Sequence, residues 1–278
     1  MSTISSHTLL ATESLTLRRV QCSGTCRHRS AEECASSTQL VFPYRGVYLR
    51  HVGTDQSVAD ANHVLFFNAQ EGYQVSHPVD GGDACLSLSL DEAVLAELTP
   101  PSLAQKGGVA SFRRQSLRID ARAQALVALL RHALDNGSIE LLEAEALVLT
   151  LVSRSLGPRT THESTSTHAR RRLADRVKVL LASDLSRRWT LADIGNAIGS
   201  SPVYLTQVFR QVEGMPLYQY QLQLRLARAL NVMDEYDDLS ALAAELGFSS
   251  HSHFASAFRR AFGRSPTEFR RSSLVADT

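Results

Sequence analysis

Two stretches in the last third of the chain combine apolar residues at helical spacing with an opposite face of polar and cationic residues. The first covers residues 202–213 and the second residues 251–262. Side chains that donate and accept hydrogen bonds suit the edges of DNA bases, and guanidinium groups suit phosphates. The outward side chains predicted to contact DNA are Val203, Thr206, Gln207, Arg210, His251, Ser252, Ser256, Arg259 and Arg260. We expect the arginines mostly to hold phosphates and the other residues to contact base edges.

Soft metal ligands cluster near the start of the chain, at Cys22, Cys26, His28 and Cys34. Three thiolates and an imidazole can form a closed tetrahedral shell for zinc, although this spacing fits no standard zinc finger. Two interpretations stay open: a metal site or redox switch, and reduced cysteines on a strand and loop. With Cys85 the cysteines number four and could pair, but the reducing compartment expected below argues against structural disulfides.

Aromatic and histidine side chains in the first third have the chemistry of a small-molecule site. The apolar runs around Val47, Leu49, Val64, Phe66 and Val75 are expected to enclose a pocket. Its possible polar contacts are Tyr48, His51, His63, Tyr73 and His77. The alternative is that these residues are core aromatics and surface histidines.

The two DNA-contacting stretches each follow another short helix, which gives two helix-turn-helix units. In the first unit, Thr190 with Asp193 forms a capping pair, and Ser201-Pro202 places a cap and a first-turn proline before the second helix. In the second unit, Gly247 ends one helix, and Ser249 or Ser250 caps the next. Residues from 216 onward predict a connecting helix of about 17 residues, roughly 25 Å long.

These residues carry a family resemblance. Ala-Ala-Glu-Leu-Gly-Phe-Ser-Ser-His-Ser-His-Phe at 243–254 and Ala-Phe-Arg-Arg-Ala-Phe-Gly-Arg-Ser-Pro at 257–266 resemble the second helix-turn-helix signature of the AraC/XylS family of transcription regulators. Ser-Pro-x-Tyr-Leu-x-x-x-Phe-Arg at 201–210 is similar to the first recognition helix of that family. The resemblance covers roughly residues 175–271. It implies a sequence-specific regulator that binds double-stranded DNA, and RNA polymerase as a partner if the protein is an activator.

The first third predicts β-structure. Short β-branched or aromatic runs at 38–42, 46–52, 63–67 and 73–76 are separated by Gly and Pro, which suggests a small antiparallel barrel or sandwich. Residues 67–83 resemble the cupin-like N-terminal domains of the same family, which implies a barrel that senses an effector. The expected fold class is therefore α+β: a cupin-like β-barrel with a helical hairpin, then an all-α domain of two helix-turn-helix units joined by a long helix.

Helical periodicity begins near residue 120 and continues to 156, with a break at Asn136-Gly137. This hairpin either closes the barrel or, as the resemblance implies, forms the contact of a homodimer. The Ser- and Thr-rich residues 157–172 predict a flexible linker. The expected domains are residues 1–156 for sensing and dimerisation and residues 173–278 for DNA binding.

An enzyme is not indicated. No paired carboxylates, Ser-His-Asp order, phosphate loop or metal triad occurs at an informative spacing, so we expect no catalytic residue and no cofactor. The one His-x-His pair, His251 and His253, falls in a helix, where residues two apart point in different directions. Two alternatives stay open: a cupin-type metal-dependent enzyme fused to a DNA-binding module, and a regulator that needs no ligand.

Composition and charge agree with this division. The chain has 278 residues, 44% hydrophobic and 21% charged, and its formal net charge is +1. Residues 1–156 hold 13 Lys or Arg against 16 Asp or Glu, whereas residues 157–278 hold 16 against 12. The basic half is thus the one with the helix-turn-helix pair. No apolar run is long enough for a membrane span and no signal peptide begins the chain, so we expect a cytoplasmic, nucleoid-associated protein without a membrane partner.

Overall fold

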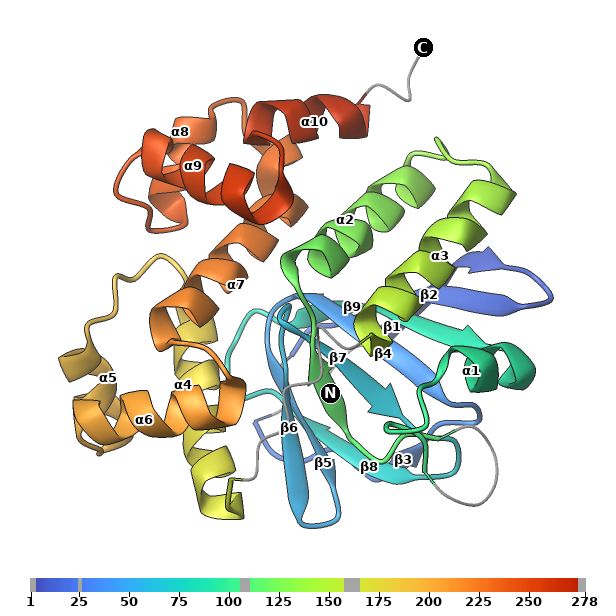
Figure 1. The fold of residues 1–278 in the computed structure, drawn as a ribbon, viewed down its shortest axis with the longest axis horizontal. Coiled ribbons are helices and arrows are strands. Elements are labelled where there is room, and N and C mark those ends of the chain that lie inside the picture. The colour runs from blue at the N-terminus through green and yellow to red at the C-terminus, as the bar shows by residue number, and fades with distance from the viewer. Residues whose placement is uncertain (1–3, 25–26, 106–110, 158–165, 275–278) are drawn as a thin grey trace.

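A computed structural model describes residues 4–24, 27–105, 111–157 and 166–274 (Figure 1). The N-terminal half contains the strands. They are β1 (Ile4–Ala11), β2 (Leu15–Cys22), β3 (Glu33–Cys34), β4 (Gln39–Arg45), β5 (Tyr48–Val52), β6 (Asp55–Ala59), β7 (His63–Phe67), β8 (Gly72–Ser76), β9 (Asp83–Leu90) and β10 (Ser116–Arg118). They form two sheets, of order β1-β2-β9-β4-β7-β10 and β3-β8-β5-β6.

Side chains of the six-stranded sheet alternate between two cores. In β7, Val64 and Phe66 join a core with α2 (Ala121–Asp135) and α3 (Leu141–Leu156). Leu65 and Phe67 instead join a core with residues of the four-stranded sheet. Because successive residues of a strand point to opposite faces, both faces of this sheet are covered. The N-terminal half therefore has three layers, with the six-stranded sheet in the middle and the α2–α3 hairpin on its outer face (Figure 1).

The hairpin expected between residues 120 and 156 is present. Asp120 caps α2 by accepting from the Ala123 amide, and the turn contains Gly137 with a φ of 64°. The short helix α1 (Glu92–Leu98), capped by Asp91, precedes the hairpin and was not expected.

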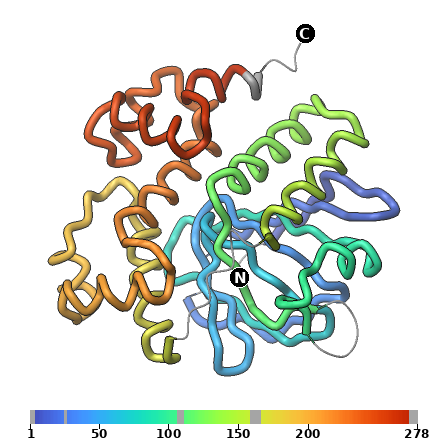
Figure 2. The backbone as a smooth tube through the Cα atoms, viewed as in Figure 1, coloured from blue at the N-terminus to red at the C-terminus, as the bar shows by residue number. Residues whose placement is uncertain are grey.

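The C-terminal half is helical. It contains α4 (His168–Ser183), α5 (Leu191–Ile198), α6 (Pro202–Glu213), α7 (Leu217–Val232), a 3₁₀ turn η1 (Met233–Glu235), α8 (Leu239–Glu245), α9 (His251–Phe262) and α10 (Pro266–Leu274). Together with the sheets of the first half, these helices confirm the α+β class. In the backbone trace, α7 runs between the first unit, α4–α6, and the second unit, α8–α10 (Figure 2).

The linker expected at 157–172 is wrong at its C-terminal end. Helix α4 already begins at His168, because the Thr167 side chain accepts the Arg170 amide and caps it. Arg170 to Arg172 therefore belong to a helix. Residues 158–165 of that expected linker lie outside the described part.

The two halves are packed against each other. Helix α2 lies between the sheet and the second helix-turn-helix unit: Ala128 is buried in the same cluster as Leu226, Leu230 and Phe254. One face of the hairpin, which the sequence assigned to closing the barrel or to dimerisation, thus contacts the chain's own DNA-binding half. Among the described helices none could span a membrane.

Candidate nucleic-acid interface

The first unit is built by the caps that the sequence predicts. Thr190 and Asp193 form a capping box at the start of α5, and the Ser201 side chain accepts the Tyr204 amide at the start of α6. Gly214 ends α6 in a left-handed conformation. Leu205, Val208 and Phe209 are buried, which turns the opposite face of α6 to solvent.

The second unit repeats this arrangement. Gly247 has a φ of 74° after α8, and of the two serines proposed as caps, Ser250 performs the role by accepting the His253 amide at 3.1 Å. Phe254 and Phe258 are fully buried, with ring centroids 5.7 Å apart. Ser265 and Glu268 form the capping box of α10, as expected.

All nine residues predicted to contact DNA are exposed on α6 and α9. Val203 is 68% exposed, so its methyl groups are accessible for apolar contact with a thymine methyl group. The Thr206 hydroxyl donates to the Pro202 carbonyl at 2.8 Å, so only its oxygen lone pairs and methyl group remain for a base. Tyr204, next to Val203, is also exposed but was not predicted as a contact residue. The helical periodicity of the sequence does not distinguish the side of α6 from its outward face.

Arg225 of α7 fixes one unit against the other. Its Nε and Nη2 atoms donate to the carbonyls of Leu185 and Arg187 in the first unit, at 2.7 and 2.8 Å. Its Nη1 atom donates to the carbonyl of Gly247 in the turn of the second unit, at 3.2 Å. One buried guanidinium thus bridges the α4–α5 loop and the α8–α9 turn, and α7 presents both recognition helices as one body. Its 16 residues correspond to roughly 24 Å of helix.

The five residues proposed to bind a small molecule do not line one pocket. His51 is buried, and its Nε2 atom lies 2.9 Å from Ser76 Oγ. Burial and the nearby Arg29 and Arg172 lower the pKa of His51. Tyr48 is buried against the His77 ring, with centroids 6.0 Å apart.

Tyr73 and the apolar residues also depart from the expected pocket. Tyr73 packs edge-on against Phe67 and donates to Glu33, and burial together with Glu33 raises its pKa to about 12. Val64 and Phe66 face the helical layer, not the space between the sheets. The expected pocket is therefore wrong in composition, because strand alternation sends its members to both faces of a sheet.

Of those five residues, His63 lines one of two cavities found in the described part of the chain, and this cavity lies between the two halves. It has a volume of about 380 Å³. Its lining residues are Asp55, Gln56, Ser57, His63, Arg113, Arg114, Gln115, Ser116, Leu117, Arg118, His168, Arg171, Arg172, Asp175, Lys178, Val212 and Glu213. Arg and Lys side chains outnumber Asp and Glu side chains in this lining. A second cavity of about 300 Å³ contains none of the five.

A buried polar cluster forms part of the lining of this cavity. His63 Nδ1 lies 2.8 Å from Asp60 Oδ1, and His63 Nε2 lies 3.6 Å from Glu213 Oε2 at the end of α6. Lys178 of α4 pairs with Asp175 at 2.8 Å and with Glu213 at 2.9 Å. The cluster thus connects the β6–β7 turn to the first unit.

The charges of this cluster set its protonation. Burial alone would lower the pKa of His63, but the Asp60 and Glu213 carboxylates outweigh it and raise that pKa. Burial alone would raise the pKa of Glu213, but Lys178 and His63 hold it well below its usual range. The pKa of Lys178 is raised, because Asp175 and Glu213 more than offset its burial. Lys178 and Glu213 are therefore held as a charged pair.

The cysteine and histidine group proposed as a metal site is not brought together by the described residues. Cys34 lies exposed on β3, His28 is exposed, and Cys26 lies outside the described part. Cys22 is buried at the end of β2, beside His77 and Asp83.

Comparison with known proteins identifies the helical half. Residues 194–272 match a family described as a helix-turn-helix domain. The chain carries an AraC-type helix-turn-helix domain. This confirms the resemblance predicted from residues 201–210 and 243–266.

The relatives of this AraC-type domain are regulators. The transcriptional activator RhaR of Klebsiella pneumoniae is 32% identical over 163 residues, which are 56% of this chain and 56% of RhaR. The dual regulator Rns of Escherichia coli is 31% identical over 97 residues, 34% of this chain and 36% of Rns. A solved AraC-type regulator from Chromobacterium violaceum is 26% identical, with 38% of this chain and 96% of that chain covered and a TM-score of 0.36. The chain thus spans less than two thirds of the length of either curated relative.

Proposed function

We propose that this protein is a sequence-specific DNA-binding regulator of transcription that acts on double-stranded DNA through α6 and α9. The observation that carries the proposal is the pair of recognition helices whose predicted contact residues are all exposed while their apolar faces are buried. The Arg225 bridge supports a fixed spacing, because it ties both units to α7. Two helices held in this way can enter successive major grooves of one duplex.

The cavity beside His63 is the proposed effector site, and its charge favours a small anion. Arg118 Nε is buried and has no hydrogen-bond partner in the part of the chain that the structure describes. Arg171 and Arg172 line the same cavity from α4. A ligand here would touch the sheet and the first helix-turn-helix unit at once, so its binding would bias the position of α6 directly. The alternative is a regulator that functions without a ligand, and the thermal unfolding experiment below tests it.

The proposed sensing and dimerisation domain comprises residues 1–156, and the proposed DNA-binding domain begins with α4. Homodimerisation is proposed through α3, because Leu141 and Leu142 are exposed near its start, Leu142 to 77%. RNA polymerase is a proposed partner if the regulator activates. The protein is proposed to have no enzymatic activity and to work in the cytoplasm at the nucleoid.

Selection from a pool of random duplexes tests the DNA-binding proposal with the full-length protein. We expect an enriched motif of two blocks separated by about one helical turn, roughly 10.5 base pairs. Recovery of duplexes with no shared sequence would contradict the proposal, since it would indicate binding through phosphates alone.

Thermal unfolding with a panel of small anions tests the effector site. A ligand that binds only the folded state raises the melting temperature, and the stabilisation grows with the logarithm of one plus the ratio of ligand concentration to dissociation constant. The Arg118→Gln variant should lose this rise, whereas Arg27→Gln, on the exposed Arg27–Asp80 pair outside the cavity, should keep it. A rise that survives Arg118→Gln would place the ligand elsewhere.

A further inference from the structure

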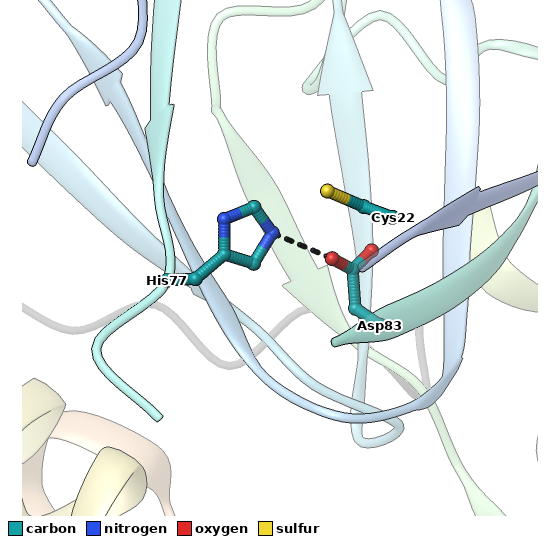
Figure 3. A group of neighbouring side chains, drawn as sticks. All are labelled: Cys22, His77 and Asp83. Atoms are coloured by element: carbon teal, nitrogen blue, oxygen red, sulfur yellow. Dashed lines mark hydrogen bonds and ion pairs between the residues drawn. The ribbon is translucent and has the colours of Figure 1, made fainter. Parts of the chain in front are cut away.

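Cys22, His77 and Asp83 form a compact group where β2 and β9 meet the loop after β8 (Figure 3). One ligand atom from each residue lies within 4.8 Å of the others, and all three side chains are buried. Among the described residues this is the one group of three or more His, Cys, Asp or Glu side chains whose ligand atoms approach so closely. We propose that it binds a divalent transition-metal ion of the zinc type. The proposal does not depend on DNA binding.

The backbone places the three ligands from both sheets. Cys22 and Asp83 are direct partners in the antiparallel ladder of β2 and β9, so their side chains leave the same face of the six-stranded sheet. His77 directly follows β8 of the four-stranded sheet. The close-up shows the imidazole, the carboxylate and the thiol pointing toward one another (Figure 3). An ion at this point would join the two sheets.

The turn that leads from His77 to Asp83 is held tightly against the end of β2. Gly82 has a φ of 70°, and a Cβ atom there would collide with the Cys22 carbonyl oxygen and with Ser23. A Cβ atom on Gly46, which precedes β5, would likewise collide with the backbone of Gly82. Because the backbone fixes the ligand residues before an ion arrives, binding needs little reordering of the chain.

The ligand set suits zinc. Zinc accepts thiolate, imidazole and carboxylate in a tetrahedral shell, and bond lengths of about 2.0–2.3 Å separate ligand atoms by about 3.3–3.8 Å. His77 Nε2 lies 2.6 Å from Asp83 Oδ2. These atoms must therefore separate by about 1 Å, and the ion takes the place of the proton between them. Cys22 binds as a thiolate, so binding releases protons to solvent. A water molecule can fill the fourth position.

A purely structural His77–Asp83 pair explains the group less well. The pair accounts for the 2.6 Å contact between His77 Nε2 and Asp83 Oδ2, but the Cys22 sulfur also lies within 4.8 Å of the ligand atoms of both residues. A metal ion would bind all three ligand atoms at once, whereas the His77–Asp83 pair involves two of them.

Cobalt titration of the reduced full-length protein tests the site. Co²⁺ replaces Zn²⁺ in tetrahedral sites and gives a thiolate charge-transfer band in the near ultraviolet. We expect this band to saturate at one ion per chain and to disappear when zinc is added. Cys22→Ser should abolish the band, and Asp83→Asn should weaken Co²⁺ binding about tenfold or more. Cys34→Ser is the matched control, because this exposed cysteine lies outside the group and its loss should leave the titration unchanged.

X-ray absorption of the zinc-loaded wild-type protein keeps the proposal testable if Cys22→Ser fails to fold. One sulfur and two or three nitrogen or oxygen neighbours are expected around zinc. Two or more sulfurs would overturn the proposal, since they would assign the ion to other cysteines. A wild-type protein that gives no thiolate band, or a band that Cys34→Ser removes, would also overturn it.

Discussion

Tyr220 of α7 donates its phenolic hydrogen to Asp60 of the β6–β7 turn, with 2.5 Å between the two oxygens. Its ring meets Phe209 of α6 edge-on, with centroids 5.3 Å apart, and its carbonyl accepts from Asn62 Nδ2 at 3.2 Å. One fully buried residue of the connecting helix thus contacts both the sheet layer and a recognition helix. Tyr220 is therefore a direct probe of the contact between the sheet layer and the first helix-turn-helix unit.

Tyr220→Phe should lower the free energy of unfolding of the full chain by about 1–3 kcal/mol, since it leaves the buried Asp60 oxygen without this donor. Urea denaturation measures the change. Tyr218→Phe is the matched control on the same helix, because Tyr218 is 61% exposed and its change should stay within about 0.5 kcal/mol. Equal effects of the two variants would show that the Tyr220–Asp60 bond contributes nothing to the packing of the halves.

The raised pKa of His63 predicts that the contact between the halves weakens as pH rises. A histidine whose folded pKa exceeds its unfolded value of about 6.5 stabilises the fold fully below that value and loses this contribution as pH passes through the folded pKa. Glu213 stays ionised throughout, because its pKa is held far lower. The free energy of unfolding should therefore fall as pH rises from about 6.5 through the folded pKa of His63.

His63→Gln provides the comparison for this pH dependence. The variant lacks the titrating ring, so its unfolding free energy should change less over the same range. The exposed His168→Gln should retain the wild-type slope. A slope that is the same in wild type and His63→Gln would assign the pH dependence to other groups.

The sequence predicts local structure well where periodicity and caps agree. The helix-turn-helix units, the break at Gly137 and strand β7 follow from apolar spacing and from Gly, Ser and Pro at fixed offsets. Strands β1, β2 and β9 were not predicted as elements. Half of residues 4–11 are polar, without strict alternation. Leu and Ser alternate at the end of β9, but its place in the middle of the sheet depends on pairing with β2 and β4.

Contacts between distant residues could not be predicted from the sequence. The outward faces of α6 and α9 depend on helical geometry alone, whereas the Asp60–Tyr220 bond joins residues 160 positions apart. The same holds for Cys22 and Asp83, which become neighbours only because β2 pairs with β9. Linear spacing favoured Cys26, His28 and Cys34, and the sheet register brought different residues to Cys22.

Phe258→Ala should destabilise the second unit by about 3–5 kcal/mol, because the ring is fully buried between Phe254, Phe262 and Phe269. Denaturation followed by circular dichroism measures this. The exposed Arg260→Ala on the same helix should change stability by no more than about 0.5 kcal/mol. A loss below about 1 kcal/mol in Phe258→Ala would mean that neighbouring side chains move to fill the space left by the ring.

Arg259→Ala should weaken binding to all DNA sequences alike. Its guanidinium is exposed in the last turn of α9 and is assigned to phosphate. Loss of one phosphate contact should reduce the slope of log affinity against log salt by about one. Binding isotherms at several salt concentrations measure the slope, with the selected duplex and a scrambled duplex compared. A loss confined to the selected duplex would show that Arg259 contacts a base.

Gln207→Ala should act in the opposite way, on the selected duplex alone. Gln207 is exposed on the outward face of α6, and its amide can donate to and accept from adenine at the same time. Its removal should weaken the free energy of binding to the selected duplex by about 1–3 kcal/mol and leave binding to the scrambled duplex nearly intact. Gln211→Ala is the control one turn further along α6, where the side chain accepts from Arg170. Equal weakening of both duplexes by Gln207→Ala would mean that the outward face of α6 does not contact bases.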